Sequence, residues 1–148
     1  MASAADKEVP ATAMQPVVEV AIAVVFGADG RLLICKRKAD TVLGGYWEFP
    51  GGKCHPGEGP EACAVREVEE ETALVVRPMR ALPIIEHAYP HARVRLHPFV
   101  CRHEVGTVEL REIADARWIM PAELADYRFP EANAPLLASI MAAGAAAV

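Results

Sequence analysis

The chain lacks the features that mark disulfide-stabilised, membrane-spanning and nucleic-acid-binding proteins. It has only four cysteines among 148 residues, and no two of them form a CxxC pair. This spacing argues against a zinc site or a disulfide framework and fits a protein of the reducing cytoplasm. No run of about 18 apolar residues is present, which argues against a membrane-spanning helix. The net charge of −5 leaves no overall basic surface for nucleic acid.

The rest of the composition is that of one globular domain. Charged residues make up 24% of the chain, an ordinary balance, and the length is sufficient to bury a core. Neither an internal repeat nor a second domain is apparent. We expect a single domain over residues 17–143. Residues 1–16 lack a long apolar segment and are expected to form a flexible tail, as are residues 144–148.

Hydrophobic patterning predicts strands interspersed with a few helices. Residues 17–26 form a nearly continuous apolar run rich in β-branched side chains, which is typical of a buried strand. A turn at residues 28–30 would pair this strand with residues 31–36 as a hairpin. Further strands are expected at 46–49, 74–76, 82–86, 94–102 and 113–119, a turn at 50–52, and short helices at 121–127 and 133–143. The last helix would place Leu136, Leu137, Ile140 and Met141 inward, and a mixed sheet covered on both sides accommodates the whole pattern.

Three glutamates gather at the end of another expected helix. Glu67 lies three residues before Glu70 and four before Glu71, so the three side chains are neighbours. They also lie at the C-terminal end, where the helix dipole disfavours negative charge. Each like-charge pair costs a few tenths of a kcal/mol, roughly. The cluster is either a solvated acidic face or a site for a hard cation such as Mg²⁺ or Mn²⁺.

The residues before these glutamates add a long spacing pattern. Gly52 to Leu74 reads G-x5-E-x7-R-E-U-x-E-E-x-A-U, where U is a bulky apolar residue. This pattern strongly resembles the Nudix box, which differs only in having glycine at the position of Ala73. That position follows the helix, where a residue with positive φ often ends it. Alanine there either costs roughly 1 kcal/mol of stability or makes the helix end differently, and we expect the chemistry to be retained.

The resemblance implies an α/β/α sandwich with a mixed β-sheet, of the α/β (α+β) class, and hydrolysis of a nucleoside diphosphate linked to another group. It implies that Mg²⁺, or Mn²⁺, is the cofactor. The positions that match metal-binding residues of the family are Gly51, through its carbonyl, Glu58, Glu67, Glu70 and Glu71. Arg66 matches the arginine that orients a carboxylate. A catalytic base that also contacts metal is expected at Glu112, with Glu109 as the competing residue.

Outside the box, the chain is most similar to the MutT subgroup, over roughly residues 17–141. The shared segments include WEFPGGK, HAYPHARVRLHPFVC and FPEAN. That subgroup removes pyrophosphate from nucleoside triphosphates, including oxidised dGTP and, in some members, cytidine nucleotides. The expected substrate-binding residues are Arg37, Lys53, His91, Phe129 and Asn133. Of these, Asn133 either reads a base edge or caps the following helix, and Phe129 either walls the pocket or packs in the core.

One departure bears on the substrate. Ala92 occupies the position of a MutT arginine, with Arg93 and Arg95 close by, which weakens a specific assignment to 8-oxo-dGTP. Three hypotheses follow: a nucleoside triphosphate pyrophosphohydrolase, a related enzyme for cytidine triphosphates, ADP-sugars or dinucleoside polyphosphates, or a Nudix-fold module that binds without catalysis. Retention of every box carboxylate favours an enzyme. The expected partner is a small nucleotide, and the chain is expected to be a monomer or homodimer.

Overall fold

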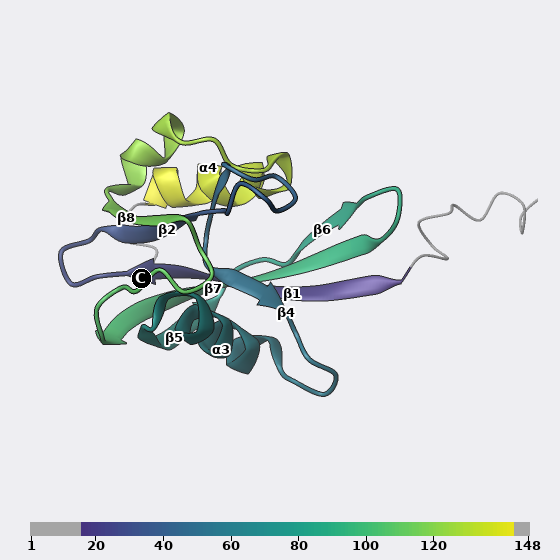
Figure 1. Ribbon diagram of the computed structural model, residues 1–148, viewed down its shortest axis with the longest axis horizontal. Helices are drawn as coiled ribbons and strands as arrows, with labels where there is room; N and C mark the ends of the chain where they lie inside the picture. Colours follow the sequence, from purple (N-terminus) through teal and green to yellow (C-terminus); the bar gives the residue numbers. More distant parts are fainter. Residues whose placement is uncertain (1–15, 144–148) are drawn as a thin grey trace, which may run out of the picture.

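A mixed eight-stranded sheet forms the centre of the computed structural model, which describes residues 16–143 (Figure 1). The expected tails at 1–15 and 144–148 lie outside the described residues. The strands run in the order β3-β2-β1-β7-β5, with β4 also pairing with β1, β6 with β7, and β8 with β2. Only the β1–β7 pair is parallel. The strands are β1 Val17–Phe26, β2 Leu32–Lys36, β3 Trp47–Glu48, β4 Gly51–Lys53, β5 Val75–Ala81, β6 Ile85–Ala88, β7 Arg93–Val105 and β8 Asp115–Ile119.

Helices cover both faces of the sheet, as the sandwich expectation requires. Helix α3 (Pro60–Thr72) lies on one face, and α4 (Ala134–Ala143) lies on the other with the 3-10 turns η1 (Pro121–Asp126) and η2 (Glu131–Asn133) (Figure 1). Gly59 precedes α3 in an extended conformation, and Pro60 opens it, where a missing backbone N–H costs nothing. No helix of the described part of the chain is long and apolar enough to cross a membrane.

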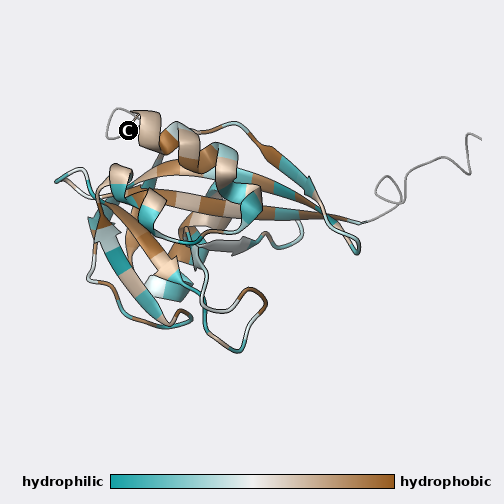
Figure 2. Ribbon diagram, turned by 90° about the horizontal axis from the view of Figure 1, so that it is seen from above, coloured by the Kyte–Doolittle hydropathy of each residue, from teal (hydrophilic) through white to brown (hydrophobic). Residues whose placement is uncertain are grey.

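Strand β1 explains why its sequence is apolar almost throughout. Its successive side chains point to opposite faces of the sheet, and both faces are covered. Ile22, Val24 and Phe26 enter the cluster beneath α4, whereas Ala21 and Val25 enter the cluster beneath α3. Figure 2 shows the apolar residues concentrated along these central strands and in α4. The small residues on the α3 side let the helix that carries the acidic cluster approach the sheet closely.

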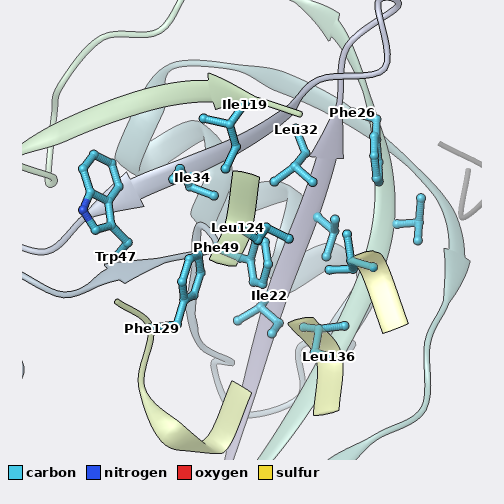
Figure 3. Packing of buried hydrophobic residues seen from close by; sticks show 13 residues of the cluster. Ile22, Phe26, Leu32, Ile34, Trp47, Phe49, Ile119, Leu124, Phe129 and Leu136 are labelled. Atoms are coloured by element: carbon cyan, nitrogen blue, oxygen red, sulfur yellow. The ribbon is translucent and has the colours of Figure 1, made fainter. Parts of the chain in front are cut away.

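The core beneath α4 holds most of the large side chains. Trp47, Phe49 and Phe129 belong to it, and Leu136 reaches in from α4 (Figure 3). Ile140 of α4 is also part of this cluster. The Phe49 and Phe129 rings are 5.1 Å apart between centroids. Trp47 and Phe49 therefore both belong to the core.

Several local expectations were wrong. The glycine pair after Pro50 is not a turn, because Gly51–Lys53 forms β4 and pairs with Ala21 and its neighbours in β1. Met141 is exposed rather than inward-facing, since only Leu136 and Ile140 of α4 are buried. Strands β1 and β2 form the expected antiparallel hairpin only next to the turn, where Phe26 pairs with Leu32. Along its whole length β2 pairs instead with β8.

Candidate active site

The acidic end of α3 lies against strand β4, and glycine makes that approach possible. A β-carbon on Gly52 would overlap the carboxylate of Glu67, and one on Gly51 would overlap the backbone of β1 at Ala21. Both glycines therefore serve close packing. The backbone N–H of Gly51 donates to Glu71 Oε1 at 3.2 Å. Two residues of β4 thus contact two of the three glutamates.

Arg66 holds most of the remaining carboxylates in place. Its Nε and Nη2 donate to the two oxygens of Glu58 at 2.7 and 2.9 Å, which is a bidentate pair. Its Nη1 donates to Glu67 Oε2 at 2.8 Å and to Glu70 Oε2 at 3.0 Å. Its Nη2 also donates to the carbonyl of Lys53. The guanidinium therefore joins the loop before α3, the acidic face of α3 and the end of β4.

The charges of this cluster are only partly balanced. Hydrogen bonds from Arg66 lower the pKa of Glu58 to about 2, so that carboxylate stays ionised. Glu71 is buried, with 8% of its surface exposed, and burial together with the negative charge of Glu48 raises its pKa to about 9. Burial also raises the pKa of Glu67, against the opposing effect of Arg66. Glu67 and Glu71 thus occupy positions where negative charge lacks sufficient compensation.

The donor set fits a hard divalent cation. Within residues 16–143, no group of three His, Cys, Asp or Glu side chains is already gathered around one point as a metal site. Glu67 and Glu70 each use one oxygen in the hydrogen bonds with Arg66, and Glu71 uses one in the bond from Gly51. The second oxygen of each, together with the nearby carbonyl of Gly51, supplies the hard ligands that Mg²⁺ prefers.

Glu112 and Glu109 differ in their relation to this cluster. The negative charge of Glu112 contributes to the raised pKa of both Glu67 and Glu71, and its backbone N–H donates to the Glu71 carbonyl at 3.4 Å. Glu109 instead pairs with Arg111 at 3.4 Å between Nε and Oε1. The chain therefore brings Glu112, not Glu109, within electrostatic reach of the glutamates of α3.

A cavity of about 340 Å³ opens beside the glycines of β4. Gly51, Gly52 and Lys53 of β4 line it, and so do Pro130, Ala132 and Asn133, which precede α4. Arg37 also lines it, with Nη1 donating to Glu48 Oε1 at 2.7 Å and Nε to the Val42 carbonyl at 2.7 Å. The cavity thus brings together the strand that contacts Glu67 and Glu71 and the segment that leads into α4.

The expected substrate-binding residues do not all reach this cavity. Asn133 lines it, and its side chain makes no hydrogen bond within the described chain, so it does not cap α4 through its amide. Phe129 is buried and packs against Phe49 in the core, so of its two expected roles it has the structural one. His91 is exposed and stacks on Tyr89 at 5.9 Å between ring centroids. Arg93 and Arg95 form ion pairs with Glu86 and Glu19 rather than facing the cavity.

Leu43, Glu48 and Tyr89 are among the cavity residues that the sequence reasoning missed. Strand alternation was the signal for Glu48, because Trp47 and Phe49 face the core and the residue between them must face the other way. Tyr89 follows β6, and its position became clear only once β6 and β7 were paired. A larger hollow of about 900 Å³ near Gly27 and Trp118 is lined by neither Gly51 nor Gly52, the β4 residues that contact the glutamates of α3. Volume alone therefore does not locate the site.

Comparisons with known proteins agree with this geometry. The NUDIX domain family model matches residues 21–139. The 8-oxo-dGTP diphosphatase of Escherichia coli K12 is 27% identical over 122 residues, covering 82% of this chain and 95% of that protein. The CTP pyrophosphohydrolase of the same strain is 31% identical over 131 residues, covering 84% and 93%. The solution structure of the E. coli ORF135 protein has a TM-score of 0.76 at 29% identity and covers 90% of this chain and 94% of that one.

The family match spans most of the chain and includes α3, β4 and the cavity between β4 and α4. The relatives that align over most of their own length are pyrophosphohydrolases of nucleotides. The chain therefore belongs to the Nudix family and is a MutT-like Nudix hydrolase.

Proposed function

We propose that the chain hydrolyses a nucleoside triphosphate to the monophosphate and pyrophosphate, with Mg²⁺ as cofactor. The observation that carries this proposal is the lining of one cavity. It includes Gly51 and Gly52, which contact Glu71 and Glu67 of the acidic cluster, and it also includes Asn133. A triphosphate bound in this cavity would put its phosphates near the carboxylates and its base at the amide. An amide both donates and accepts, which suits a base edge.

The roles of the box residues follow from their contacts. Glu67, Glu70 and Glu71, with the Gly51 carbonyl, would hold the cation, and Glu58 would support the loop through Arg66. When bound, the cation would neutralise phosphate oxygens and increase the acidity of the attacking water. Arg66 fixes the orientation of Glu67 and Glu70 and limits the reorganisation needed during the reaction.

Glu112 is the best-placed residue to accept the proton of the attacking water. It lies within electrostatic reach of Glu67 and Glu71 and is itself exposed at the mouth of the cluster. A positioned carboxylate base contributes on the order of 10²-fold or more to the rate. Lys53 and Arg37 line the cavity with positive charge suited to phosphate oxygens.

Two substrates compete within this proposal. An oxidised purine triphosphate such as 8-oxo-dGTP would place its base at Asn133. A cytidine triphosphate is the second candidate, favoured by the CTP pyrophosphohydrolase relative and by Ala92, which is buried and brings no charge to the cavity.

The deciding experiment measures pyrophosphate and phosphate release from a panel of nucleotides, with Mg²⁺ and with a chelator. The panel holds dGTP, 8-oxo-dGTP, dCTP, CTP, 5-methyl-dCTP, ADP-ribose and a dinucleoside polyphosphate. Metal-dependent release of pyrophosphate from one triphosphate is the expected result and names the base. Turnover of ADP-ribose or the dinucleoside polyphosphate alone would replace the proposed substrate class. Tight nucleotide binding without any turnover would indicate a binding module.

A matched pair of variants tests the roles. Glu71→Gln removes one charged oxygen ligand and should lower kcat/KM at least about 10-fold, with the circular dichroism spectrum unchanged. Glu109→Gln alters a carboxylate that is paired with Arg111 and should retain turnover. Equal activity in the two variants would contradict the proposed metal site.

A further inference from the structure

Two thiols lie beside Arg66, and the proposed reaction uses neither of them. Cys63 is buried in the first turns of α3, and Cys54 is partly exposed just after β4. The side chain of Cys54 lies within hydrogen-bonding reach of the Cys63 thiol, and Cys54 packs against the cluster of buried residues that contains Cys63. The other two cysteines, Cys35 and Cys101, are fully buried in the sheet.

Cys63 contacts the parts that organise the acidic cluster. Its thiol donates to the carbonyl of Gly52 at 3.5 Å, and Arg66 Nη2 donates to its sulfur at 3.7 Å. The same Nη2 holds Glu58 and the carbonyl of Lys53. Any movement of the Cys63 sulfur therefore acts directly on the guanidinium that orients Glu58, Glu67 and Glu70.

The segment between the two cysteines has room to adjust. It contains Gly57, which has a φ of +78°, and Gly59, and the space around a β-carbon built on either glycine is empty. The segment is also tied to the site, because the backbone N–H of His55 donates to Glu58 Oε1 at 2.9 Å. A covalent bond between the thiols would shorten this loop and pull on the link from His55 through Glu58 to Arg66.

We propose that Cys54 and Cys63 form a reversible disulfide under peroxide, and that closing it lowers turnover by displacing Arg66 from its carboxylates. In the first step the Cys54 sulfur attacks hydrogen peroxide, which forms a sulfenic acid at Cys54 and releases one water. In the second step the Cys63 sulfur attacks the Cys54 sulfur and forms the S–S bond. The sulfenic oxygen leaves as water with the proton of the Cys63 thiol.

The two cysteines have different roles in this sequence because their environments differ. Cys54 is the one that solvent and a small oxidant reach, whereas Cys63 is buried beside it. Cys63 therefore reacts as the second, resolving thiol.

The test oxidises the full-length protein with hydrogen peroxide, blocks the remaining thiols with an alkylating reagent and maps the peptides by mass spectrometry. The expected product is one disulfide joining the peptides of Cys54 and Cys63, with Cys35 and Cys101 alkylated only after denaturation. Recovery of both site thiols in reduced form, or of Cys54 as an irreversible acid, would overturn the proposal. This arm does not depend on any enzymatic activity.

The second arm measures the consequence for the site, and its turnover readout rests on the proposed function. Oxidation should lower turnover at least several-fold, and a dithiol reductant should restore it. Mn²⁺ binding, followed by calorimetry, should weaken in parallel, and this readout decides the coupling even if no nucleotide is hydrolysed. A disulfide that forms without changing either readout would contradict the coupling to Arg66.

Cys54→Ser is the matched control. Its turnover and Mn²⁺ affinity should be insensitive to peroxide, and continued sensitivity would contradict the proposal.

Discussion

At the scale of single residues, Arg66 is the organising side chain of the site. Three carboxylates accept from one guanidinium, and this network compensates repulsion that the i,i+3 and i,i+4 spacing would otherwise cause. The compensation is incomplete at Glu71, which lies on the side of α3 facing Gly51 and makes no hydrogen bond with Arg66. Glu71 is therefore the carboxylate with the most to gain from a bound cation.

The protonation of Glu71 predicts how stability depends on pH when metal is absent. Its pKa of about 9 in the folded chain lies above the ordinary 4.5, so folding favours the protonated form. This stabilisation is complete below about pH 4.5 and is lost as the pH rises toward 9. Glu71→Gln keeps a neutral side chain at every pH. In chelator, the free energy of unfolding of the wild type should fall below that of Glu71→Gln progressively between these limits.

Urea unfolding of both proteins at several pH values measures the difference between their free energies of unfolding. Titrating groups other than Glu71 contribute equally to both proteins, so this difference reports Glu71 alone. Added Mg²⁺ at pH 8 should stabilise the wild type more than the variant, because a bound ligand stabilises only the fold that holds it. Parallel stability curves for the two proteins would contradict the assignment of a raised pKa to Glu71.

At the scale of elements, α3 ends at Ala73 in the conformation that is typical of a glycine at this position. Ala73 ends the helix in the left-handed region, with a φ of 68°, and its N–H donates to the carbonyl of Glu69. The helix therefore keeps the glycine-type ending with alanine in place. Ala73→Gly should raise the free energy of unfolding by about 1 kcal/mol, since glycine adopts positive φ without a steric penalty.

Thermal or urea unfolding checks this value. Ala62→Gly is the matched control, because Ala62 lies exposed within the same helix and glycine there should destabilise by about 1 kcal/mol. Destabilisation by both substitutions would contradict the left-handed ending.

The contact between β4 and α3 yields a second prediction at this scale. A β-carbon on Gly52 would overlap Glu67, so Gly52→Ala should displace that carboxylate and reduce turnover by about 10-fold or more. Gly59→Ala is the control, because the space around Gly59 is open and its φ is negative. That variant should keep its turnover and change stability by about 0.5 kcal/mol or less. Steady-state kinetics compares the two variants, and similar losses in both would argue against a specific clash with Glu67.

The elements also show what sequence patterns determine and what they omit. The apolar run of β1 and the box spacing are local features, and each predicted its element correctly. The failures depend on long-range pairing. Two adjacent glycines after proline are typical of a turn, yet β1 pairs with them and makes them a strand. Residues such as Tyr89 reach the cavity only through the pairing of β6 with β7, which no local pattern encodes.

At the scale of the whole molecule, the sheet joins two cores that share the same strands. Alternate side chains of β1 and β2 enter the cluster beneath α4 and the cluster beneath α3. Because the same strands pack into both clusters, unfolding of one cluster would disrupt the strands on which the other cluster depends. We therefore expect a single cooperative unfolding transition, as is usual for domains of this size.

The two tryptophans test this expectation because they lie on opposite sides of the sheet. Trp47 belongs to the cluster beneath α4, and Trp118 packs against the cluster beneath α3. In Trp118→Phe the remaining Trp47 reports the cluster beneath α4. In Trp47→Phe the remaining Trp118 reports the cluster beneath α3. Within each variant, the urea midpoint seen by fluorescence should coincide with the midpoint seen by far-ultraviolet circular dichroism. Ile140→Ala, introduced beneath α4, should then cost about 2–5 kcal/mol and shift the Trp118 signal as much as the Trp47 signal. A shift confined to Trp47 would mean that the α3 side, which carries the proposed metal ligands, unfolds independently of the rest.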